Sequence, residues 1–374
     1  MAGHPPAPQA IVINPWMEGP HRGAMANSLT PRLAGIATAV PSYVLDQAAV
    51  ARAGLGLFQG TLADGGRAAA VYANAAIGTR YSCVPLEWYL APHSFAERND
   101  LYLRHAVELA EQAIRSALVR AGLAFGDVDA IVAVSTSGIA TPSLDALLVE
   151  RLSLRRDIER LPIFGLGCAG GVLGLARSGA LARARPGARV LLVVVELCGL
   201  TFRHGDRSKS NLIASALFGD GAVACVVSTA GAGLGLVAWG EHTWPDSLDV
   251  MGWHVGNDGL GVVFSRDIPA LVRRDFATVT DDFLARHGLT RARIDQFICH
   301  PGGAKVVDAL EEALGVPAGA LEDSRSVLRD YGNMSAATVL FVLERALGAG
   351  RQGRYLLSAL GPGFTAGFLL AEVA

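Results

Sequence analysis

The chain contains one ordered series of predicted elements twice, and this duplication constrains its fold more than any other feature. In the first half, the helix HAVELAEQAIRSALVRAGL precedes VDAIVAVSTSG, a glycine-rich helix, the strand RVLLVVVEL and FGDGAVACVVS. In the second half, a helix around DFATVTDDFLARHGL precedes IDQFICHPGG, two further helices, the strand RYLLSAL and GPGFTAGFLLAEV. Agreement of order across several elements indicates two copies of one supersecondary unit.

The predicted strands are nearly continuous apolar runs that alternate with helices. Such strands are typical of parallel-rich sheets that helices cover on both faces. Two sheets that share a middle layer of helices form a five-layered αβαβα body, so the predicted fold class is α/β. The first half is predicted at residues 31–230 and the second half at residues 231–374.

Residues 1–30 differ in composition from the rest of the chain. They are rich in proline, glycine and small polar residues, and they lack the apolar region and cleavage site of a signal peptide. We therefore predict a flexible N-terminal extension, in which Met25 is an alternative start.

Composition excludes several classes of protein. The formal net charge is -2 and no long basic block is present, so nucleic acid and anionic membrane surfaces are not expected partners. The longest apolar stretch, RVLLVVVELCGL, is too short to span a bilayer. The five cysteines lack CxxC spacing, which argues against a disulfide framework and against a zinc site. We predict a reduced, cytoplasmic setting and no metal.

A reactive cysteine is predicted at Cys168, in LPIFGLGCAGGVLGLARSGALARA. LPIFGLG is an apolar run of strand length, and the glycine-spaced segment after Cys168 is typical of a buried helix, which places the thiol at a helix N-terminus. The helix dipole and the unpaired N–H groups favour the thiolate there, and the thiolate is the nucleophilic form. The alternative is a buried cysteine that only fills space as a small hydrophobic residue.

Two further residues favour the reactive interpretation. His300 ends a predicted strand in QFICHPGGAK, and Asn333 begins a predicted helix in YGNMSAATVLF. GLGCAGG and YGNMSAA occupy the same place in the two halves, so Cys168 and Asn333 are predicted at equivalent helix starts. A pseudo-twofold arrangement of the halves then brings the three side chains to one cavity, where they can perform acyl-thioester chemistry. The alternatives are a strand-end surface histidine and a helix-capping asparagine.

From Pro31 to Ala374 the chain resembles the thiolase superfamily and, within it, the chalcone synthase-like type III polyketide synthases. The resemblance implies a thiolase-like fold and a homodimer. The motifs that carry it are GCAGG around Cys168, ALFGDGA around Phe218, ICHPGG around His300, YGNMS around Asn333 and LGPGFT at 360–365.

The resemblance also implies a reaction. An acyl group from a coenzyme A thioester is loaded onto Cys168, malonyl-CoA is decarboxylated, and the enolate condenses with the bound acyl group. Repetition lengthens a poly-β-keto chain, which cyclises in the same cavity. His300 is expected to stabilise the thiolate as an imidazolium, and His300 and Asn333 to donate hydrogen bonds to the thioester oxygen during decarboxylation. Small cavity residues and an excess of arginine over lysine predict a medium or long aliphatic starter and an alkylpyrone or alkylresorcinol product, as in bacterial members.

Residues of the substrate cavity follow from the same resemblance. Phe218 matches the family's gatekeeper phenylalanine, Cys198 lies where plant members usually carry threonine, and Thr141 replaces a common methionine. Trp253 lies in a loosely aligned segment and is a candidate for the cavity floor. The predicted substrate-binding residues are Phe218, Thr136, Thr141, Cys198, Thr201, Trp253, Ser335, Gly361, Pro362 and Gly363.

Coenzyme A is predicted to bind at Lys305, one of only two lysines, because a phosphate at this helix start meets a positive charge and backbone donors. The basic residues that family members carry in the early helix are mostly absent, and Arg67 is the nearest candidate. The predicted partners are an acyl-CoA starter, malonyl-CoA and a second copy of the chain, whose interface includes SGIATPSLDALL. No cofactor other than these thioesters is expected.

Two other functions remain open from the residues. A β-ketoacyl-ACP synthase III uses the same three residue types for a single condensation, but GPGFT, FGDGA and HPGG favour the polyketide synthase. An inactive partner subunit of a polyketide assembly is the non-enzyme alternative, and loss of Cys, His or Asn would favour it; all three are present.

Overall fold

The computed structural model describes residues 29–58 and 65–373, without the side chains of residues 65–67. Nearly all of the predicted N-terminal extension, with Met25, lies outside the described residues.

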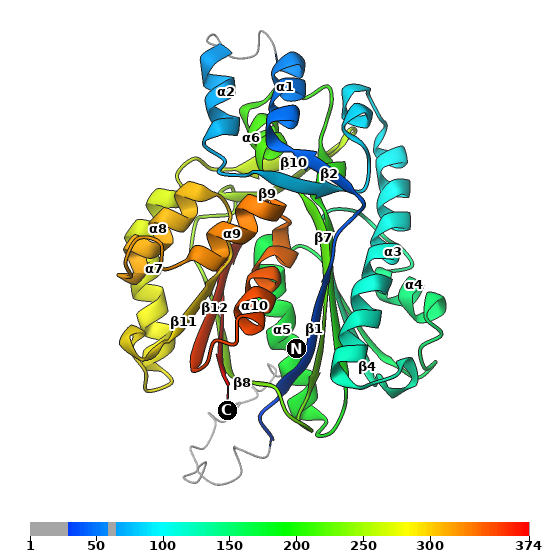
Figure 1. The fold of residues 1–374 in the computed structure, drawn as a ribbon, viewed down its shortest axis with the longest axis vertical. Helices are drawn as coiled ribbons and strands as arrows, with labels where there is room; N and C mark the ends of the chain where they lie inside the picture. The colour runs from blue at the N-terminus through cyan, green and yellow to red at the C-terminus, as the bar shows by residue number, and fades with distance from the viewer. Residues whose placement is uncertain (1–28, 59–64, 374) are drawn as a thin grey trace, which may run out of the picture.

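The first half forms a five-stranded sheet (Figure 1). β4 pairs in parallel with β5 and β6, whereas β7 pairs antiparallel with both β6 and β1. The order across the sheet is β1 (Arg32–Ala39), β7 (Asp220–Ser228), β6 (Val190–Leu197), β4 (Ala130–Val134) and β5 (Glu159–Ile163).

The second half repeats these relations. β11 pairs in parallel with β12, and β13 pairs antiparallel with β12 and β8. This agreement in pairing confirms the predicted duplication. The order across the second sheet is β8 (Leu234–Thr243), β13 (Thr365–Glu372), β12 (Arg354–Gly361) and β11 (Gln296–Cys299).

The two sheets meet at one edge, because β1 and β8 pair at Arg32 with Gly235 and at Leu33 with Leu234, which makes a continuous nine-stranded sheet. The prediction of parallel-rich sheets is wrong: within the described chain, antiparallel pairs outnumber parallel ones. The reason is clearest at β12 and β13, where only residues 362–364 link the strands, and so short a link permits only antiparallel pairing.

Helices complete five layers, as predicted. Val172 and Leu175 of α5 share one core with Val339 and Leu343 of α10, and strands of both halves contribute to this core. α3 and α4 cover the outer face of the first sheet, and α7 and α8 cover that of the second. The bounds are α3 (Phe95–Ala121), α4 (Leu144–Arg151), α5 (Gly170–Ala184), α7 (Ile268–Ala285), α8 (Ala304–Leu314) and α10 (Thr338–Gly348).

Smaller elements lie at one end of this body, beyond the carboxyl ends of the parallel strands (Figure 1). α1 and α2 stand there above α6, and two small two-stranded antiparallel sheets lie beneath them. They are α1 (Gln47–Leu57), α2 (Gly65–Ala73), α6 (Lys209–Leu217), β2 (Tyr43–Asp46) with β3 (Thr79–Ser82), and β9 (Met251–Gly256) with β10 (Gly259–Phe264). The remaining helix is α9 (Glu322–Tyr331), and the short 3-10 turns are η2 (Leu86–Leu90), η3 (Phe125–Asp127), η4 (Gly167–Ala169), η5 (Cys198–Thr201), η6 (Arg291–Arg293) and η7 (Ser335–Ala337).

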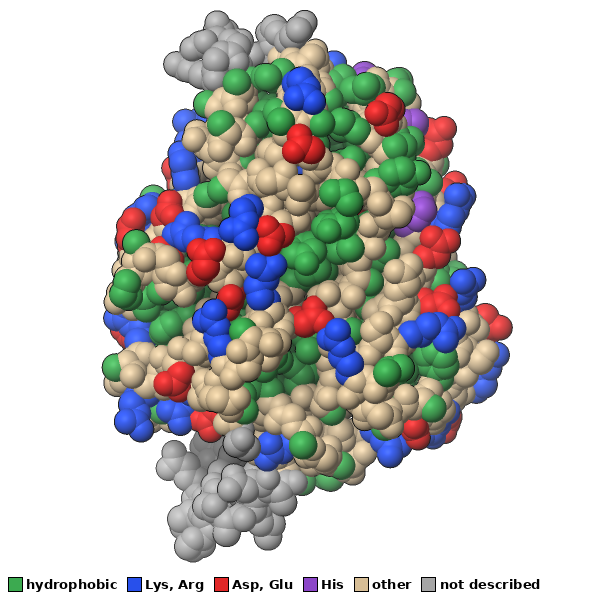
Figure 2. Space-filling view, viewed as in Figure 1, with side chains coloured by type: hydrophobic (Ala, Val, Ile, Leu, Met, Phe, Trp, Pro, Cys, Tyr) green, Lys and Arg blue, Asp and Glu red, His purple; other side chains and the backbone are tan. Residues whose placement is uncertain are grey.

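The surface agrees with the composition. Positive and negative side chains are interspersed over the face shown in Figure 2, without a large patch of one sign. All five cysteines are free and buried. Among the described helices, none has the length and apolar character needed to cross a bilayer.

Candidate active site

Cys168 lies between an edge strand and a central helix. β5 ends at Ile163, η4 holds Cys168 as its middle residue, and α5 begins at Gly170. Glycines bring this turn close to the second half: a Cβ atom on Gly171 would lie 2.2 Å from the carbonyl oxygen of Ala336, and one on Gly167 would lie 2.5 Å from Cδ of Pro362. The local sequence therefore permits the two halves to meet at the reactive cysteine.

Asn333 lies near the corresponding turn of the second half. η7 precedes α10 as η4 precedes α5, but Asn333 stands two residues before η7, whereas Cys168 is inside η4. The predicted equivalence of the two positions thus holds for the helices and not for the individual residues. Asn333 Oδ1 accepts a hydrogen bond from the Ser335 N–H at 2.8 Å, and its Nδ2 donates to the Gly302 carbonyl oxygen at 3.1 Å. The second N–H of the amide is left for another acceptor.

His300 follows the last residue of β11. Its backbone N–H donates to the Ser358 carbonyl oxygen at 2.9 Å, which fixes the backbone beside β12. The residue is only 4% exposed, and neither ring nitrogen has a hydrogen-bond partner among the described residues. Buried polar atoms without partners are rare in proteins, so these nitrogens are suited to bind a substrate atom.

One cavity of about 840 Å³, the active-site cavity, brings Cys168, His300 and Asn333 together. Lys209 and Lys305, the only two lysines of the chain, line the same cavity. Arg266 is a third cation on its wall, and all three cationic residues are exposed. No ion pair within the described structure occupies these three side chains.

Burial controls the protonation of the site. The pKa of the Cys168 thiol is raised to about 12, mainly by burial; the contact of Sγ with Ser335 Oγ at 3.7 Å lowers it, and the nearby carboxylate of Glu196 contributes to the rise. Burial also lowers the pKa of His300 to about 3. Burial thus disfavours the charged form of each group, and the expected imidazolium–thiolate pair requires the attraction between the two charges to offset this desolvation.

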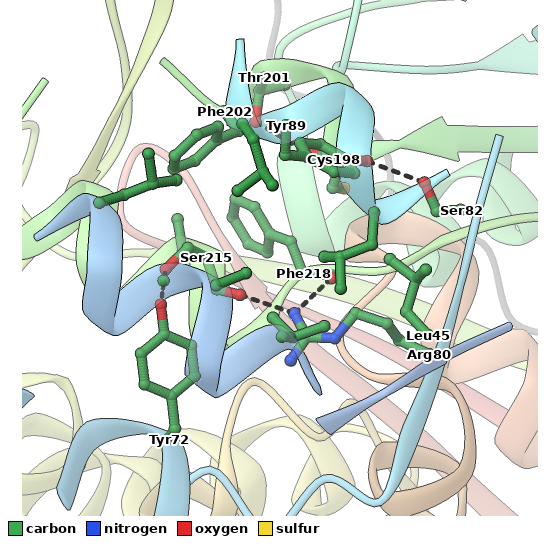
Figure 3. Close-up of a pocket in the computed structure, with 18 of the residues that line it drawn as sticks. Leu45, Tyr72, Arg80, Ser82, Tyr89, Cys198, Thr201, Phe202, Ser215 and Phe218 are labelled. Carbon is green, nitrogen blue, oxygen red and sulfur yellow. Dashed lines mark hydrogen bonds between the residues drawn. The ribbon is translucent and has the colours of Figure 1, made fainter. Parts of the chain in front are cut away.

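A second cavity of about 70 Å³, the apolar cavity, lies on the side of α1 and α2 (Figure 3). Phe218, Cys198 and Thr201 line it together with Phe58 and Phe202. Four of its polar side chains are paired, with Tyr72 Oη 2.7 Å from Ser215 Oγ and Ser82 Oγ 2.8 Å from Tyr89 Oη, and the Arg80 guanidinium donates to backbone carbonyl oxygens. The walls are thus suited to hydrocarbon.

Phe218 stands where the two cavities approach each other. Its ring contacts Phe264, which lines the active-site cavity, with centroids 5.8 Å apart. It also contacts Trp253 edge to face at 6.3 Å. Buried Arg80 holds the backbone of Phe218 by donating to its carbonyl oxygen at 2.9 Å.

Trp253, which contacts the Phe218 ring, is joined to Thr136 by a hydrogen bond. Trp253 Nε1 donates to the Thr136 carbonyl oxygen at 2.9 Å. The Thr136 hydroxyl in turn donates to Glu196, a fully buried carboxylate, at 2.7 Å. Thr136 therefore uses its side chain to satisfy a buried acid.

The predicted GPG residues support the turn of Cys168. A Cβ atom on Gly361 would lie 2.4 Å from the Leu166 carbonyl oxygen, and Pro362 packs against Gly167. Gly363 adopts φ +126, and its carbonyl oxygen accepts a hydrogen bond from Ser247 Oγ at 3.2 Å.

Several predicted substrate-binding residues line neither cavity, and these are Thr136, Thr141, Trp253, Ser335, Gly361, Pro362 and Gly363. Thr141 is exposed on the surface and lines neither cavity within one chain. Arg67 belongs to α2, but its side chain lies outside the described residues. Ala70 of the same helix lines the active-site cavity, so the face of α2 that reaches this cavity is not basic at that position.

The sequence interpretation missed several residues of the site. Lys209 was recognisable as one of two lysines, but only the fold places it beside Lys305. Phe264 and Glu196 carried no signal, because each stands in an apolar strand whose contacts are made with distant segments.

The fold and the cavity together define a thiolase-like condensing enzyme. The family models for chalcone and stilbene synthases match the chain at residues 85–231, for the N-terminal domain, and at residues 236–373, for the C-terminal domain. The chain belongs to the chalcone and stilbene synthase family and is a type III polyketide synthase, an acyltransferase.

Individual relatives support this assignment. A putative chalcone synthase of Bacillus subtilis is 38% identical over 352 residues, which cover 90% of this chain and 96% of the relative. A 1,3,6,8-tetrahydroxynaphthalene synthase of Streptomyces peucetius is 41% identical over 309 residues, with 80% of this chain and 82% of the relative covered. The solved 1,3,6,8-tetrahydroxynaphthalene synthase of Streptomyces coelicolor superposes with a TM-score of 0.88 at 30% identity, over 91% of this chain and 99% of that protein.

Proposed function

We propose that Cys168 carries the growing chain while malonyl-CoA is condensed repeatedly onto an acyl-CoA starter, with His300 and Asn333 as its catalytic partners. The observation that carries this proposal is the single cavity into which both halves deliver these three side chains. No cofactor other than the coenzyme A thioesters takes part.

Loading begins from a neutral pair. The Cys168 thiol attacks the starter carbonyl while His300 accepts the thiol proton, so no thiolate has to persist at the buried sulfur. Coenzyme A leaves as its thiol and takes that proton. Ser335 begins the η7 turn, and its hydroxyl contacts Cys168 Sγ. This contact keeps the nucleophile oriented.

Decarboxylation then generates the nucleophile for condensation. As carbon dioxide leaves malonyl-CoA, negative charge develops on the thioester oxygen. The free N–H of Asn333 and an N–H of the otherwise unpartnered His300 ring can donate to this oxygen, and such preorganised donors stabilise an enolate.

The exposed cations at the cavity suit coenzyme A. Lys305 lies in the first turn of α8, and Lys209 begins α6, so each adds a charge beside backbone N–H groups that can bind phosphate. We assign the phosphates to Lys305 and Lys209, with Arg266 as a third contact. Arg67 remains a secondary candidate on the neighbouring helix.

We propose a medium or long aliphatic starter. Cys198 is small and lines the apolar cavity, whose walls offer a hydrocarbon tail little polar competition. The proposed product is an alkylpyrone or alkylresorcinol, formed when the extended chain cyclises. The name of the Streptomyces peucetius relative states a naphthalene product for that protein.

The protein is further proposed to be a cytoplasmic homodimer. Ile139, within the predicted interface segment that contains Thr141, is 44% exposed, and Phe164, after the end of β5, is 59% exposed. In the same segment, the buried Asp145 carboxylate accepts no hydrogen bond and has only Arg160 Nη1 at 3.5 Å. A second copy can cover the exposed apolar groups.

Product analysis tests the starter. Purified protein is incubated with malonyl-CoA and acyl-CoAs of graded length, and products are identified by mass. Long aliphatic starters are expected to exceed coumaroyl-CoA in kcat/KM, and Cys198→Phe is expected to depress long starters more than short ones by overfilling the apolar cavity. Val119→Phe, at a position 78% exposed on α3, is the matched control. A preference for coumaroyl-CoA contradicts the proposal.

Sedimentation tests the assembly. The expected species has twice the 39.0 kDa chain mass, and Phe164→Asp is expected to shift it toward the monomer. A wild-type monomer that is stable and active at micromolar concentration contradicts the dimer.

A further inference from the structure

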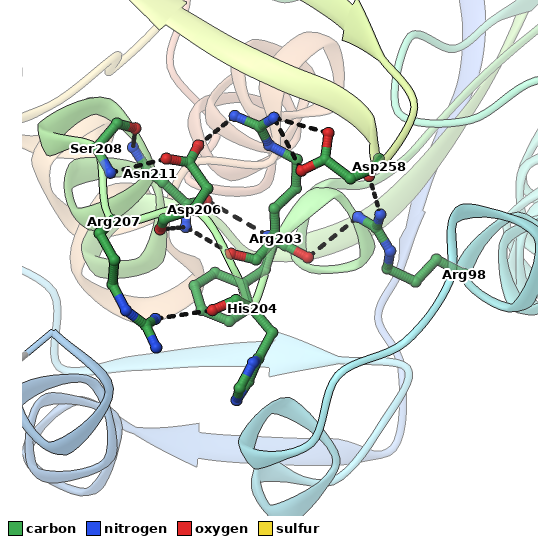
Figure 4. A network of polar contacts seen from close by, with 9 residues as sticks. Arg98, Arg203, His204, Asp206, Arg207, Ser208, Asn211 and Asp258 are labelled. Atoms are coloured by element: carbon green, nitrogen blue, oxygen red, sulfur yellow. Dashed lines mark hydrogen bonds and ion pairs between the residues drawn. The ribbon is translucent and has the colours of Figure 1, made fainter.

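Two arginines hold the tip of the β9–β10 hairpin (Figure 4). The hairpin turns at Asp258, between Gly256 and Gly259. Arg203 Nη1 donates to both carboxylate oxygens of Asp258 at 3.1 Å. Arg98 Nη2 donates to the carbonyl oxygen of the same residue. Arg98, Arg203 and Asp258 are called the hairpin clamp below.

The clamp also holds the wall of the apolar cavity. Arg98 is only 4% exposed, and its Nη1 donates to the carbonyl oxygens of Leu200 at 3.3 Å and Phe202 at 3.1 Å. These carbonyls flank Thr201, in the η5 turn that also contains Cys198. One buried guanidinium therefore joins the hairpin tip to the η5 turn.

Two glycines let the hairpin approach the arginines. A Cβ atom on Gly259, where φ is +103, would lie 2.7 Å from the Phe95 ring and 3.1 Å from Arg98 Nη2. A Cβ atom on Gly261 would lie 2.6 Å from Arg203 Nη2. Any side chain at either position would push the hairpin away from the clamp.

The hairpin contributes to one wall of the active-site cavity. At its base, Met251 and Phe264 line the active-site cavity. In its middle, Trp253 contacts Phe218 and hydrogen-bonds Thr136. β9 and β10 form a separate two-stranded sheet without a ladder to the nine-stranded sheet, so side-chain contacts and the clamp set the position of the hairpin.

We propose that the hairpin clamp fixes the distance between the β9–β10 hairpin and the η5 turn and thereby limits the number of extensions. This inference rests on the proposed iterative condensation. Arg98 and Arg203 are positioning residues, because neither lines the active-site cavity. When the clamp is weakened, Trp253 and Phe264 move outward more often, and a longer chain fits before cyclisation.

Removing the charge of Asp258 tests the clamp. Asp258→Asn is expected to raise the ratio of longer to shorter products about two- to fivefold, the population shift that a partly exposed ion pair supports. Asp258→Glu is expected to restore most of the wild-type ratio. In Asp258→Asn, the backbone amides of residues 251–264 are expected to exchange hydrogen faster by a similar factor. This measurement is made without substrate and does not depend on catalysis.

The matched control is Asp281→Asn. Asp281 receives two hydrogen bonds from Arg291, at 2.8 and 3.0 Å, and its side chain is 48% exposed, close to the 56% of Asp258. Asp281 lies on α7 and lines neither cavity. The Asp281→Asn variant should therefore give the same ratio of longer to shorter products as the wild type.

Salt offers a test without a variant. Raising sodium chloride to about 1 M screens the Arg203–Asp258 ion pair. The ratio of longer to shorter products from the wild type should then move toward the ratio from Asp258→Asn. The ratio from Asp258→Asn should not change with salt. An unchanged ratio in Asp258→Asn, unchanged exchange of the hairpin, or an equal effect of Asp281→Asn overturns the inference. If the proposal of an aliphatic starter is wrong, the wild-type enzyme will show a higher kcat/KM for another acyl-CoA. The product ratios of the variants are then measured with that acyl-CoA.

Discussion

The turn of Cys168 and its counterpart in the second half share a backbone design but carry different chemistry. Each is a 3-10 turn that leads into a helix of the central layer. The middle residue of the first turn is Cys168, whereas the middle residue of the second is Ala336, which is fully buried. The polar residue of the second half, Asn333, stands before its turn. Duplication thus set the place of the site, and later divergence gave the nucleophile to one half and the donors to the other.

The sharpest way to break this comparison is to remove the nucleophile. Cys168→Ala is expected to lower polyketide formation roughly a thousandfold or more, because no other thiol can hold the chain. The double variant Cys168→Ala/Ala336→Cys should not recover activity, since Ala336 lines neither cavity. Product formation by mass spectrometry is the measurement, and circular dichroism checks the fold. Activity in either variant would contradict the assigned division of roles.

The role of the second half is tested by removing the hydrogen-bond donor of Asn333. Asn333→Ala is expected to lower malonyl-CoA decarboxylation roughly a hundredfold, the effect of deleting one oxyanion donor. Acyl loading, followed as the mass increase of the protein, should persist because it does not use this donor. If loading and decarboxylation fall equally, Asn333 serves the structure through its bonds to Ser335 and Gly302 rather than the enolate.

A pH profile sharpens the role of His300 opposite the cysteine. Burial holds the thiol pKa of Cys168 near 12, far above neutrality, so the thiolate fraction and the rate of iodoacetamide alkylation should rise about tenfold per pH unit between about pH 6 and 9. Cys168→Ala supplies the background from the other four cysteines. A rate that is flat above about pH 5 would instead demonstrate an imidazolium–thiolate pair.

The smallest expected effect concerns the packing beneath the first turn. Gly361→Ala places a methyl group 2.4 Å from the Leu166 carbonyl oxygen and is expected to lower the free energy of unfolding by about 1–3 kcal/mol and to reduce loading of Cys168. Gly348→Ala is the control, because nothing lies within 4 Å of its added Cβ atom. Denaturant unfolding compares the two variants. Equal stability would show that the turn can shift without cost.

The sequence predicted the duplicated order of elements and the five layers, because strand and helix periods and glycine-bounded turns are local signals. It also nominated Cys168, His300 and Asn333, since each stands at the end of a predicted element. It did not predict the antiparallel pairing of β7 and β13, because strand direction depends on which distant strand becomes the neighbour. Thr141 was nominated by motif alone, and the fold leaves it on the surface.

What the sequence determined by itself is the scaffold and the three chemical groups, because these depend on residues within a few positions of one another. Only the tertiary structure decided which side chains share the active-site cavity, how burial sets the pKa values of Cys168 and His300, and how the hairpin clamp joins α3, η5 and the β9–β10 turn. Those properties depend on desolvation and on contacts between segments more than a hundred residues apart, and such contacts leave no periodic pattern in the chain.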